Sequence, residues 1–366
     1  MQRRTFLLAG ASLPLACALP QQAFAQQLPF EPKAAETWRR FETIMRVELV
    51  FPSGINRVWL PAPSIDSEWQ RTYGNTWSGN ATRSQLVHDK KYGAAMLYAE
   101  WNESVKDPVI EMTSSFATRD RAIDLSKPGK VEALSPADRA FYTAPTELIP
   151  TDGIVRAKAR EATRGTKTDM DKARALYDWI VDNTFRDPKT RGCGVGDIKT
   201  MLETGNLGGK CADLNALYVG MARAIGLPAR DVYGLRVVKS QFGYRSLGAG
   251  TDNVTRAQHC RAEVWLSDFG WVPVDPADVR KVVLEEKAAP TTVDDPLVKA
   301  VRPKLFGAWE MNWLAYNNAH DIALPGAKGA KIGFLMYPQA ETGQGRLDSL
   351  DPDNFKYSIR AREIAA

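Results

Sequence analysis

Apolar and polar residues alternate along the first third of the chain, as they do in strands with one buried face. Every second residue from Phe41 to Phe51 is apolar or threonine, and a Pro-Ser-Gly turn follows at 52–54. The next alternating run then predicts a hairpin with the first. Residues 26–135 are therefore expected to form a β-rich N-terminal domain. The segments with strand patterns are 41–51, 57–61, 95–101 and 109–116.

Helical periodicity replaces this alternation in the middle of the chain. Ser135 followed by Pro136 is typical of a helix start, and residues 171–183 repeat apolar side chains at helical spacing. The strongest helical pattern begins at Cys211 and ends at Gly226, because glycine commonly terminates a helix. Its apolar stripe comprises Leu214, Tyr218, Met221, Ala222 and Ile225.

Strand patterns return in the last part of the chain. Because helices come first and strands that can pair with one another follow, the expected fold class is α+β, with helices packed on an antiparallel sheet. The predicted strands are 236–238, 259–266, 271–274, 331–337 and 355–363.

The N-terminal residues have the pattern of an export signal. An arginine pair at 3–4 precedes an apolar stretch, residues 6–20, and Ala-Phe-Ala at 23–25 is typical of a cleavage site. The stretch is too short to cross a bilayer. The arginine pair resembles a twin-arginine signal, while ordinary secretion and lipid attachment at Cys17 stay open. We expect residues 1–25 to be removed and the product to be periplasmic, with no membrane anchor.

Composition narrows the function classes. The 366 residues include 48 Lys and Arg against 43 Asp and Glu, a net charge of +5. Both signs are scattered along the chain, so no nucleic-acid partner is expected. Four cysteines are too few for a disulfide-dense scaffold. Cysteines and histidines do not occur at metal-binding spacings, so neither a metal nor a cofactor is expected.

Cys211 is the candidate nucleophile, because it stands at the start of the strongest predicted helix. A thiolate there faces unpaired backbone N–H groups and the positive end of the helix dipole, and Lys210 adds a cation. Both effects lower the pKa of a thiol and favour the nucleophilic thiolate. Glycines at 208–209 would let a substrate carbonyl approach, so that the Cys211 N–H could hold an oxyanion. The alternative is a small buried residue at a helix start.

His259 and Asp275 lie on two predicted strands that a short turn at 267–270 joins. With a three-residue loop, Trp265 would face Trp271, and His259 would lie diagonal to Asp275 on the same side of the sheet. Another register would place the two residues directly opposite each other. Either register lets the carboxylate orient the imidazole. Taken singly, the histidine could be structural and the aspartate could cap a turn.

These segments together resemble the transglutaminase-like superfamily. The stretch from Gly-Gly-Lys-Cys-Ala-Asp-Leu to Ile-Gly-Leu-Pro-Ala-Arg, residues 208–230, looks like the nucleophile helix of this family. Segments 259–265 and 270–276 look like its histidine and aspartate strands, and the resemblance covers roughly residues 150–282. It implies a papain-like thiol fold with a catalytic triad. The residues that would take the catalytic roles are Cys211, His259 and Asp275.

The resemblance implies an exported thiol enzyme that acts on amide bonds of a peptide or protein substrate. His259 would take the proton of Cys211, the thiolate would form a thioester, and Asp275 would orient the imidazole. An amine acceptor would make the enzyme a transglutaminase, and water would make it a protease or amidase. A non-catalytic periplasmic binding or assembly protein that reuses the fold is the alternative.

The expected organisation has four segments. They are the signal peptide (1–25), the β-rich N-terminal domain (26–135), the transglutaminase-like catalytic core (136–282) and a C-terminal extension that completes the core (283–366).

Three further features stay open. An oxidising compartment would favour a disulfide between Cys193 and Cys260 if Cys211 must remain free; the alternative is that Cys260 is simply buried. The second oxyanion donor could be a Trp, Asn or Gln side chain upstream of the nucleophile. His88 and His320 are expected to be structural or surface residues.

Overall fold

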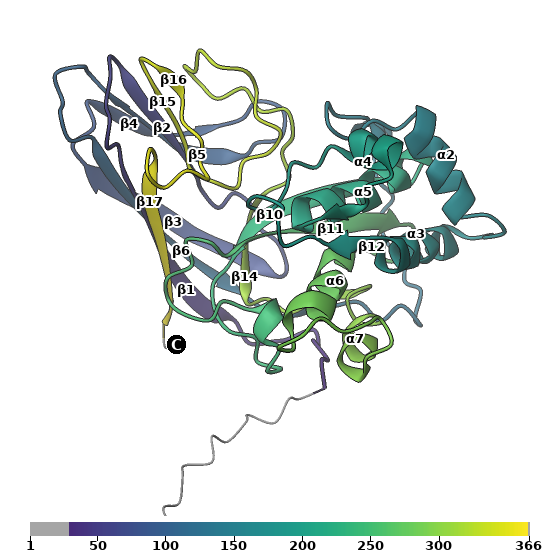
Figure 1. Cartoon of the computed structure of the whole chain (residues 1–366). Helices are drawn as coiled ribbons and strands as arrows, with labels where there is room; N and C mark the ends of the chain where they lie inside the picture. The colour runs from purple at the N-terminus through teal and green to yellow at the C-terminus, as the bar shows by residue number, and fades with distance from the viewer. Residues whose placement is uncertain (1–28, 365–366) are drawn as a thin grey trace, which may run out of the picture.

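The computed structural model describes residues 29–364, so the expected signal segment and Cys17 lie outside the described residues. Figure 1 shows an N-terminal part built of strands beside a part in which helices cover a further sheet. The strands are β1 (Arg39–Glu48), β2 (Asn56–Pro61), β3 (Gln70–Gly79), β4 (Arg83–His88), β5 (Ala95–Trp101), β6 (Val109–Thr118), β7 (Arg121–Ala122), β8 (Phe185–Arg186), β9 (Gly208–Gly209), β10 (Ala229–Arg236), β11 (Gln258–Leu266), β12 (Gly270–Val274), β13 (Ala308–Trp309), β14 (Trp313–Asn317), β15 (Gln339–Thr342), β16 (Gly345–Arg346) and β17 (Lys356–Ile364). The helices are α1 (Pro136–Thr143), α2 (Gly153–Ala162), α3 (Asp169–Asn183), α4 (Ile198–Thr204), α5 (Cys211–Ala224), α6 (Pro276–Glu285) and α7 (Pro296–Val301), with a 3₁₀ turn at Arg245–Leu247. None of these helices is long and apolar enough to cross a membrane.

Two antiparallel sheets form the N-terminal part, in the strand orders β17-β1-β6-β3 and β16-β15-β2-β5-β4. One buried apolar cluster draws side chains from both sheets, so the sheets face each other across a shared core. Phe41, Trp101 and Phe116 are fully buried there.

The first predicted strand keeps its alternation, but its predicted pairing is wrong. Every second side chain from Phe41 to Leu49 is buried, whereas Phe51 is 65% exposed beyond the end of β1. β1 pairs with β17 and β6, and β2 pairs with β15 and β5, so the two strands form no hairpin. The turn after β1 carries the chain from one sheet to the other instead. Each strand therefore finds its partners far away in the sequence.

A third antiparallel sheet, in the order β12-β11-β10-β14, supports the helices. Cys260, Ala262 and Val264 point from β11 into the core that this sheet shares with α3, α5 and α6. Helix α5 lies at the centre of this core, and even its polar residues Asp213 and Asn215 are buried. The predicted α+β class, with helices packed on an antiparallel sheet, is confirmed.

Predicted helix ends agree closely with the structure. The Ser135 hydroxyl accepts a hydrogen bond from the first turn of α1. Helix α3 starts at Asp169, two residues before the predicted start, because Thr168 forms a capping box with Asp171. Helix α5 begins at Cys211, and Gly226 follows its end with a φ of 87° that favours glycine.

Other strands differ from the prediction. β10 ends at Arg236, where a strand was expected to begin, and residues 331–337 contain only an isolated bridge from Ile332 to Ile322. Strands β3 and β4 were not predicted. Both lie at sheet edges and are largely exposed, so their sequences lack the alternation that marks a half-buried strand.

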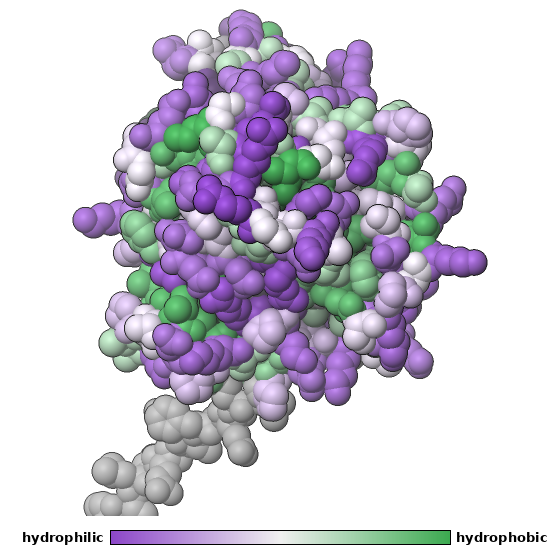
Figure 2. Space-filling model, turned by 90° about the vertical axis from the view of Figure 1, so that its right-hand side faces the viewer, coloured by the Kyte–Doolittle hydropathy of each residue, from purple (hydrophilic) through white to green (hydrophobic). Residues whose placement is uncertain are grey.

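The C-terminal residues contribute to both parts of the molecule. β14 joins the helix-covered sheet, whereas β15, β16 and β17 join the two N-terminal sheets. Residues 349–358, just before and within β17, form one wall of the cavity that contains the candidate site. The helical side of the molecule is covered mainly by hydrophilic residues with apolar ones scattered among them (Figure 2).

Candidate active site

Cys211 is the first residue of α5 and is only 3% exposed. A short parallel pairing of β8 with β9 leads the chain to this point. Gly209 is required there, because a Cβ atom would lie 2.6 Å from the Cβ of Asp213. The Asp213 carboxylate accepts a hydrogen bond from the backbone N–H of Lys210 at 2.9 Å. The predicted position of Cys211 at a helix start is confirmed.

The same carboxylate holds a glycine-rich loop, residues 192–196, against the helix start. Asp213 Oδ1 accepts hydrogen bonds from the backbone N–H groups of Val195 and Gly196, each at 2.9 Å. Gly194 has a φ of 93°, and a Cβ atom there would overlap Asp213 Oδ2 at 1.8 Å. Both the backbone conformation and the close approach therefore require glycine.

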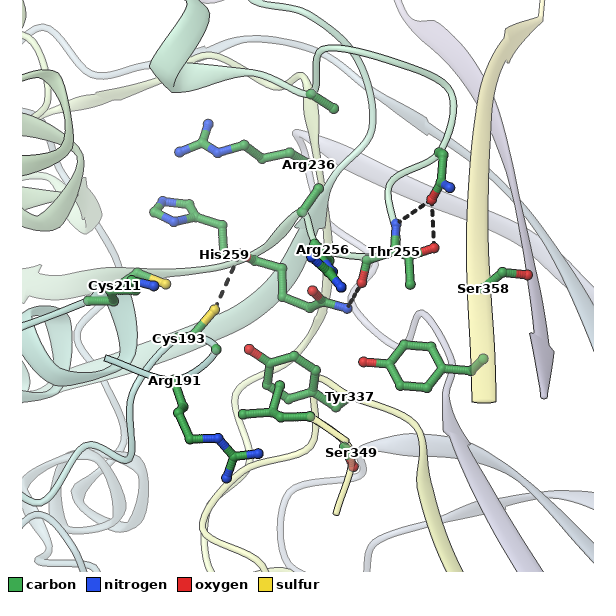
Figure 3. A pocket seen from close by; sticks show the side chains of 18 of the residues that line it. Arg191, Cys193, Cys211, Arg236, Thr255, Arg256, His259, Tyr337, Ser349 and Ser358 are labelled. Carbon is green, nitrogen blue, oxygen red and sulfur yellow. Dashed lines mark hydrogen bonds between the residues drawn. The ribbon is translucent and has the colours of Figure 1, made fainter. Parts of the chain in front are cut away.

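This loop places Cys193 beside Cys211 (Figure 3). The Cys193 carbonyl accepts a hydrogen bond from the Ala212 N–H at 2.9 Å. The Cys193 thiol donates one to the carbonyl of Gln258 at 3.3 Å. The loop therefore connects the start of α5 with the strand that carries His259.

His259 and Asp275 meet through their side chains. Trp265 pairs with Trp271, so the register follows from the three-residue loop and makes His259 diagonal to Asp275, as predicted. His259 Nε2 lies 2.8 Å from Asp275 Oδ2. Both residues are buried. Because Nε2 is engaged with the carboxylate, Nδ1 is the ring nitrogen left for the thiol.

Asp275 combines two roles that looked like alternatives in the sequence. It is the N-cap of α6, and its Oδ1 accepts a hydrogen bond from the backbone N–H of Asp278 at 3.0 Å. Asn215, four residues after Cys211 on α5, also donates to Oδ1 at 3.3 Å and to the carbonyl of Cys260 at 2.8 Å. Helix α5 is thereby tied to both strands of the site.

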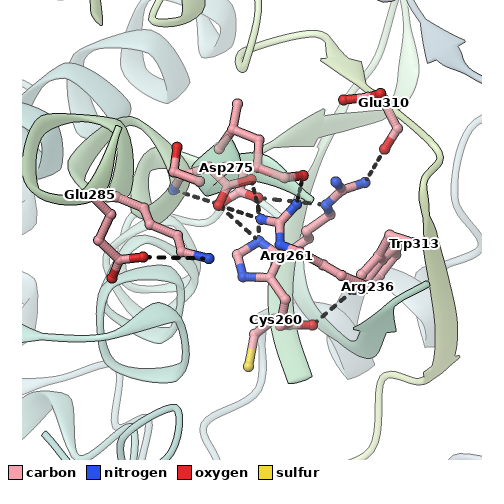
Figure 4. Close-up of polar contacts among 12 residues, drawn as sticks. Arg236, Cys260, Arg261, Asp275, Glu285, Glu310 and Trp313 are labelled. Carbon is pink, nitrogen blue, oxygen red and sulfur yellow. Dashed lines mark hydrogen bonds and ion pairs between the residues drawn. The ribbon is translucent and has the colours of Figure 1, made fainter. Parts of the chain in front are cut away.

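Sequence reasoning missed a second carboxylate at the imidazole. Asp278 Oδ1 lies 3.4 Å from His259 Nε2. Arg236 Nη2 donates to both oxygens of Asp278, at 2.5 and 2.6 Å. The Arg261 guanidinium lies 3.6 Å from Asp275 Oδ2, and Figure 4 shows these groups in one polar network. Only the spacing of Asp278, one turn after Asp275 at a helix start, could have indicated its position.

The pKa values shift in directions that favour a thiolate beside an imidazolium. Burial and Arg236 lower the pKa of His259, but Asp278 and Asp275 outweigh them and raise it to about 9. Burial raises the pKa of Cys211, yet interactions with Cys193, Cys260 and His259 hold it well below its usual value. Both shifts therefore favour the charged forms of the two groups.

The three cysteines of the described chain converge at this point. Their sulfur atoms lie within 4.8 Å of one another, and all three are buried free thiols. The Cys193–Cys260 disulfide that the sequence left open is therefore not formed in this structure. The Cys260 thiol lies 3.8 Å from the sulfur of Met336 instead. Two groups in the described chain have ligand atoms close enough to share a metal ion: these thiols, and His259 with Asp275 and Asp278.

A cavity of about 1020 Å³ opens onto Cys211 and His259. Upstream of the nucleophile, the described residues lining it are basic, cysteine or glycine, so none is the Trp, Asn or Gln expected as second oxyanion donor. His88 is exposed at the end of β4, and His320 is buried 3.5 Å from Asp231. Neither of these histidines lines the cavity.

Comparisons with known proteins identify one family model, one relative in sequence and similar solved structures. Residues 156–276 match the family model of the transglutaminase-like superfamily. An uncharacterized protein of Haemophilus influenzae is 36% identical over 342 residues, which cover 88% of this chain and 91% of that protein. A crystal structure from Cytophaga hutchinsonii, provisionally described as a cysteine protease, covers 89% of this chain and 98% of its own at 15% identity, with a TM-score of 0.50. The periplasmic domain of TgpA from Pseudomonas aeruginosa aligns at 15% identity over 70% of this chain and 92% of its own, with a TM-score of 0.33.

Several findings agree on the family. The matched residues contain the helix that begins with Cys211 and the two strands that bring His259 to Asp275. The similarity to the Haemophilus protein extends over most of both chains. The chain therefore belongs to the transglutaminase-like superfamily.

Proposed function

We propose that this protein is a thiol enzyme that cleaves or transfers acyl groups at peptide amide bonds. Cys211 is the nucleophile, His259 the acid–base group and Asp275 its orienting partner. The observation that carries the proposal is the 2.8 Å contact between His259 Nε2 and Asp275. The cavity that opens onto His259 also opens onto the Cys211 thiol. In a papain-like arrangement, this contact leaves the other ring nitrogen for the nucleophile.

The first half of the reaction forms a thioester. The Cys211 thiolate attacks the carbonyl carbon of the amide, and the backbone N–H of Cys211 at the start of α5 donates to the developing oxyanion. The His259 imidazolium then protonates the leaving nitrogen, and the C–N bond breaks. Asp275 stabilises the imidazolium and, in the neutral ring, keeps the proton on Nε2, so that Nδ1 can accept from the thiol.

The second half of the reaction depends on the acceptor. Neutral His259 takes a proton from water or from an amine, which attacks the thioester carbonyl and releases the Cys211 thiolate. Water gives hydrolysis, as in a protease or amidase, and an amine gives transfer, as in a transglutaminase. The same residues serve both outcomes, so the proposal covers both.

The buried charges around His259 favour an enzyme over a binding protein. Asp275, Asp278 and Arg236 are each at most 2% exposed, and burying charged groups in this way is costly unless they are paired. Sites that tune the pKa of a catalytic group commonly contain such arrangements. We also propose that the enzyme acts in the periplasm, to which residues 1–25 would direct the chain.

Trapping of an acylated Cys211 tests the proposal. The protein is incubated with a library of peptide amides, quenched in acid and digested. The mass of the peptide that contains Cys211 is then measured by mass spectrometry. We expect acyl adducts on Cys211 in the wild type and in Cys193→Ala, but none in Cys211→Ala. Amide turnover by Cys211→Ala at the wild-type rate would refute the assignment.

A further inference from the structure

The cavity in front of Cys211 has an unusual charge. Among the described residues that line it there is no aspartate or glutamate, yet the lining includes six basic side chains. These residues are Arg186, Arg191, Lys210, Arg236, Arg256 and Lys281. In the whole chain, basic and acidic residues are nearly equal in number, at 48 and 43. The cavity is therefore far more basic than the chain as a whole.

Carboxylates behind the wall neutralise only part of this charge. Arg236 is paired with Asp278, as described above. Arg186 and Lys281 share one carboxylate, that of Glu285, and Arg191 is paired with Asp348 at 2.7 Å. Burial lowers the pKa of Lys281, and the neighbouring Arg236 lowers it further. The inner wall thus keeps a surplus of positive charge.

Two of the basic side chains have no acidic partner. Lys210 and Arg256 form no ion pair with any residue in the described part of the chain. Lys210 directly precedes Cys211, and Arg256 lies three residues before His259. Both are therefore close in the chain to the groups that would react. Because a hollow with low-dielectric walls concentrates the field of such charges, an anionic ligand would be attracted to it.

We infer that the cavity binds the carboxylate-bearing part of an acidic peptide next to the amide that reacts with Cys211. This inference rests on the proposed function and adds the class of substrate. The carboxylate belongs either to an Asp or Glu side chain or to the end of a peptide chain. Lys210 and Arg256 are its partners, since they hold the charge that the protein itself leaves unpaired.

Peptide selection by an inactive variant tests the inference. Cys211→Ala protein is immobilised and incubated with two random hexapeptide libraries, one with a free carboxyl terminus and one with an amidated terminus. Bound peptides are eluted and sequenced by mass spectrometry. Enrichment of Asp and Glu in the amidated library would indicate side-chain recognition, and enrichment confined to the free-acid library would indicate recognition of a terminal carboxylate. Either result supports the inference.

A charge-matched control identifies the residues involved. Adding Lys210→Gln and Arg256→Gln is expected to reduce the enrichment on the order of tenfold, as is raising the salt concentration. Adding Arg83→Gln and Lys130→Gln removes the same charge from exposed residues outside the cavity and should leave the enrichment unchanged. Arg256→Gln alone changes an exposed side chain, so its effect can be read even if Lys210→Gln disturbs folding.

The outcomes separate this inference from the proposed function. Absence of acidic enrichment, or equal losses in the two double variants, would overturn the inference. If wild-type protein still formed acyl-Cys211 adducts with neutral peptides, the proposed function would stand without it. Acidic enrichment without any acyl adduct would instead support the binding site and contradict the catalytic role.

Discussion

Asp275 uses its two carboxylate oxygens for different purposes. Oδ2 meets the imidazole of His259, and Oδ1 caps α6. Two substitutions can separate these purposes, because asparagine caps a helix about as well as aspartate, whereas alanine does not.

We expect Asp275→Asn to lower amide turnover by roughly 10³- to 10⁴-fold with little change in Tm. The amide group would donate to His259 Nε2, so the proton would move to Nδ1 and the ring could no longer accept from Cys211. Asp275→Ala should lose similar activity and in addition about 1 kcal/mol of stability from the lost cap. Initial rates and thermal unfolding of both variants measure the two effects. Normal activity in Asp275→Asn would show that the aspartate serves only as a cap.

The thiols should differ in reactivity towards iodoacetamide. The pKa of Cys211 is lowered, whereas that of Cys193 is raised by its interaction with Cys211 and that of Cys260 by burial. At pH 6 to 7 we expect Cys211 to be alkylated first, and His259→Ala to slow its labelling because the imidazolium is gone. Mass spectrometry of the three cysteine peptides gives the rates. Equal labelling of all three in folded protein would contradict the assignment.

The pH dependence of acylation follows from the raised pKa of His259. Its imidazolium is present below the folded pKa of about 9 and is lost as pH rises through that value. The rate of thioester formation should therefore decrease as the pH rises above about 9, although Cys211 remains a thiolate. Stopped-flow acylation between pH 6 and 10 provides the measurement. A rate that keeps rising to pH 10 would show that a proton on His259 is not needed.

At the scale of elements, Asp213 joins the start of α5 to the loop before it. Its carboxylate accepts hydrogen bonds from three backbone N–H groups, those of Val195, Gly196 and Lys210. Removing it would leave the buried N–H of Gly196 and the part-buried N–H groups of Val195 and Lys210 without this partner, which costs on the order of 1–3 kcal/mol.

We expect Asp213→Ala to lower the free energy of unfolding by about 2–3 kcal/mol and to reduce alkylation of Cys211, because the helix start loses its fixed position. Asp197→Ala is the matched control. Asp197 caps α4 through the N–H of Thr200, so its loss should cost about 1 kcal/mol and leave Cys211 labelling unchanged. Urea unfolding and iodoacetamide kinetics give both quantities. Similar labelling in the two variants would mean that Asp213 has no influence on the thiol.

What the sequence could predict depended on how local each interaction is. Helix α5 and the turn between β11 and β12 were predictable because caps, glycines and a three-residue loop act within a few residues. The partners of β1 were not, since β17 lies more than 300 residues away and no local pattern specifies it. Arg236 was missed for a related reason: it reaches Asp278 only because β10 pairs with β11.

At the scale of the whole molecule, the helix-covered sheet depends on residues beyond the matched family region. β14 pairs with β10, and the indole of Trp313 donates to the carbonyl of His259 at 3.0 Å. Figure 1 shows β14 at the border between the sheet and the N-terminal part. The strand therefore supports the backbone of the residue proposed as the base.

A fragment of residues 136–282 is accordingly expected not to fold. It lacks β14, so one edge of its sheet would expose unpaired backbone groups. The surface that Trp313 covers in the whole protein would also be exposed. Residues 29–364 should unfold cooperatively, whereas the fragment should show no cooperative transition by circular dichroism. A fragment that unfolds cooperatively and whose Cys211 is still alkylated first would show that the core is independent of the rest.

The wall formed by residues 349–358 has a consequence for the order of events during synthesis. The ribosome makes Cys211, His259 and Asp275 well before this wall, and the sheet that contains β1 is incomplete until β17, the last strand of the described residues, has been made. Contacts between such distant residues slow folding, and chains fold from the N-terminus as they emerge. A nascent chain thus carries these three residues for some time before this wall of the cavity is present.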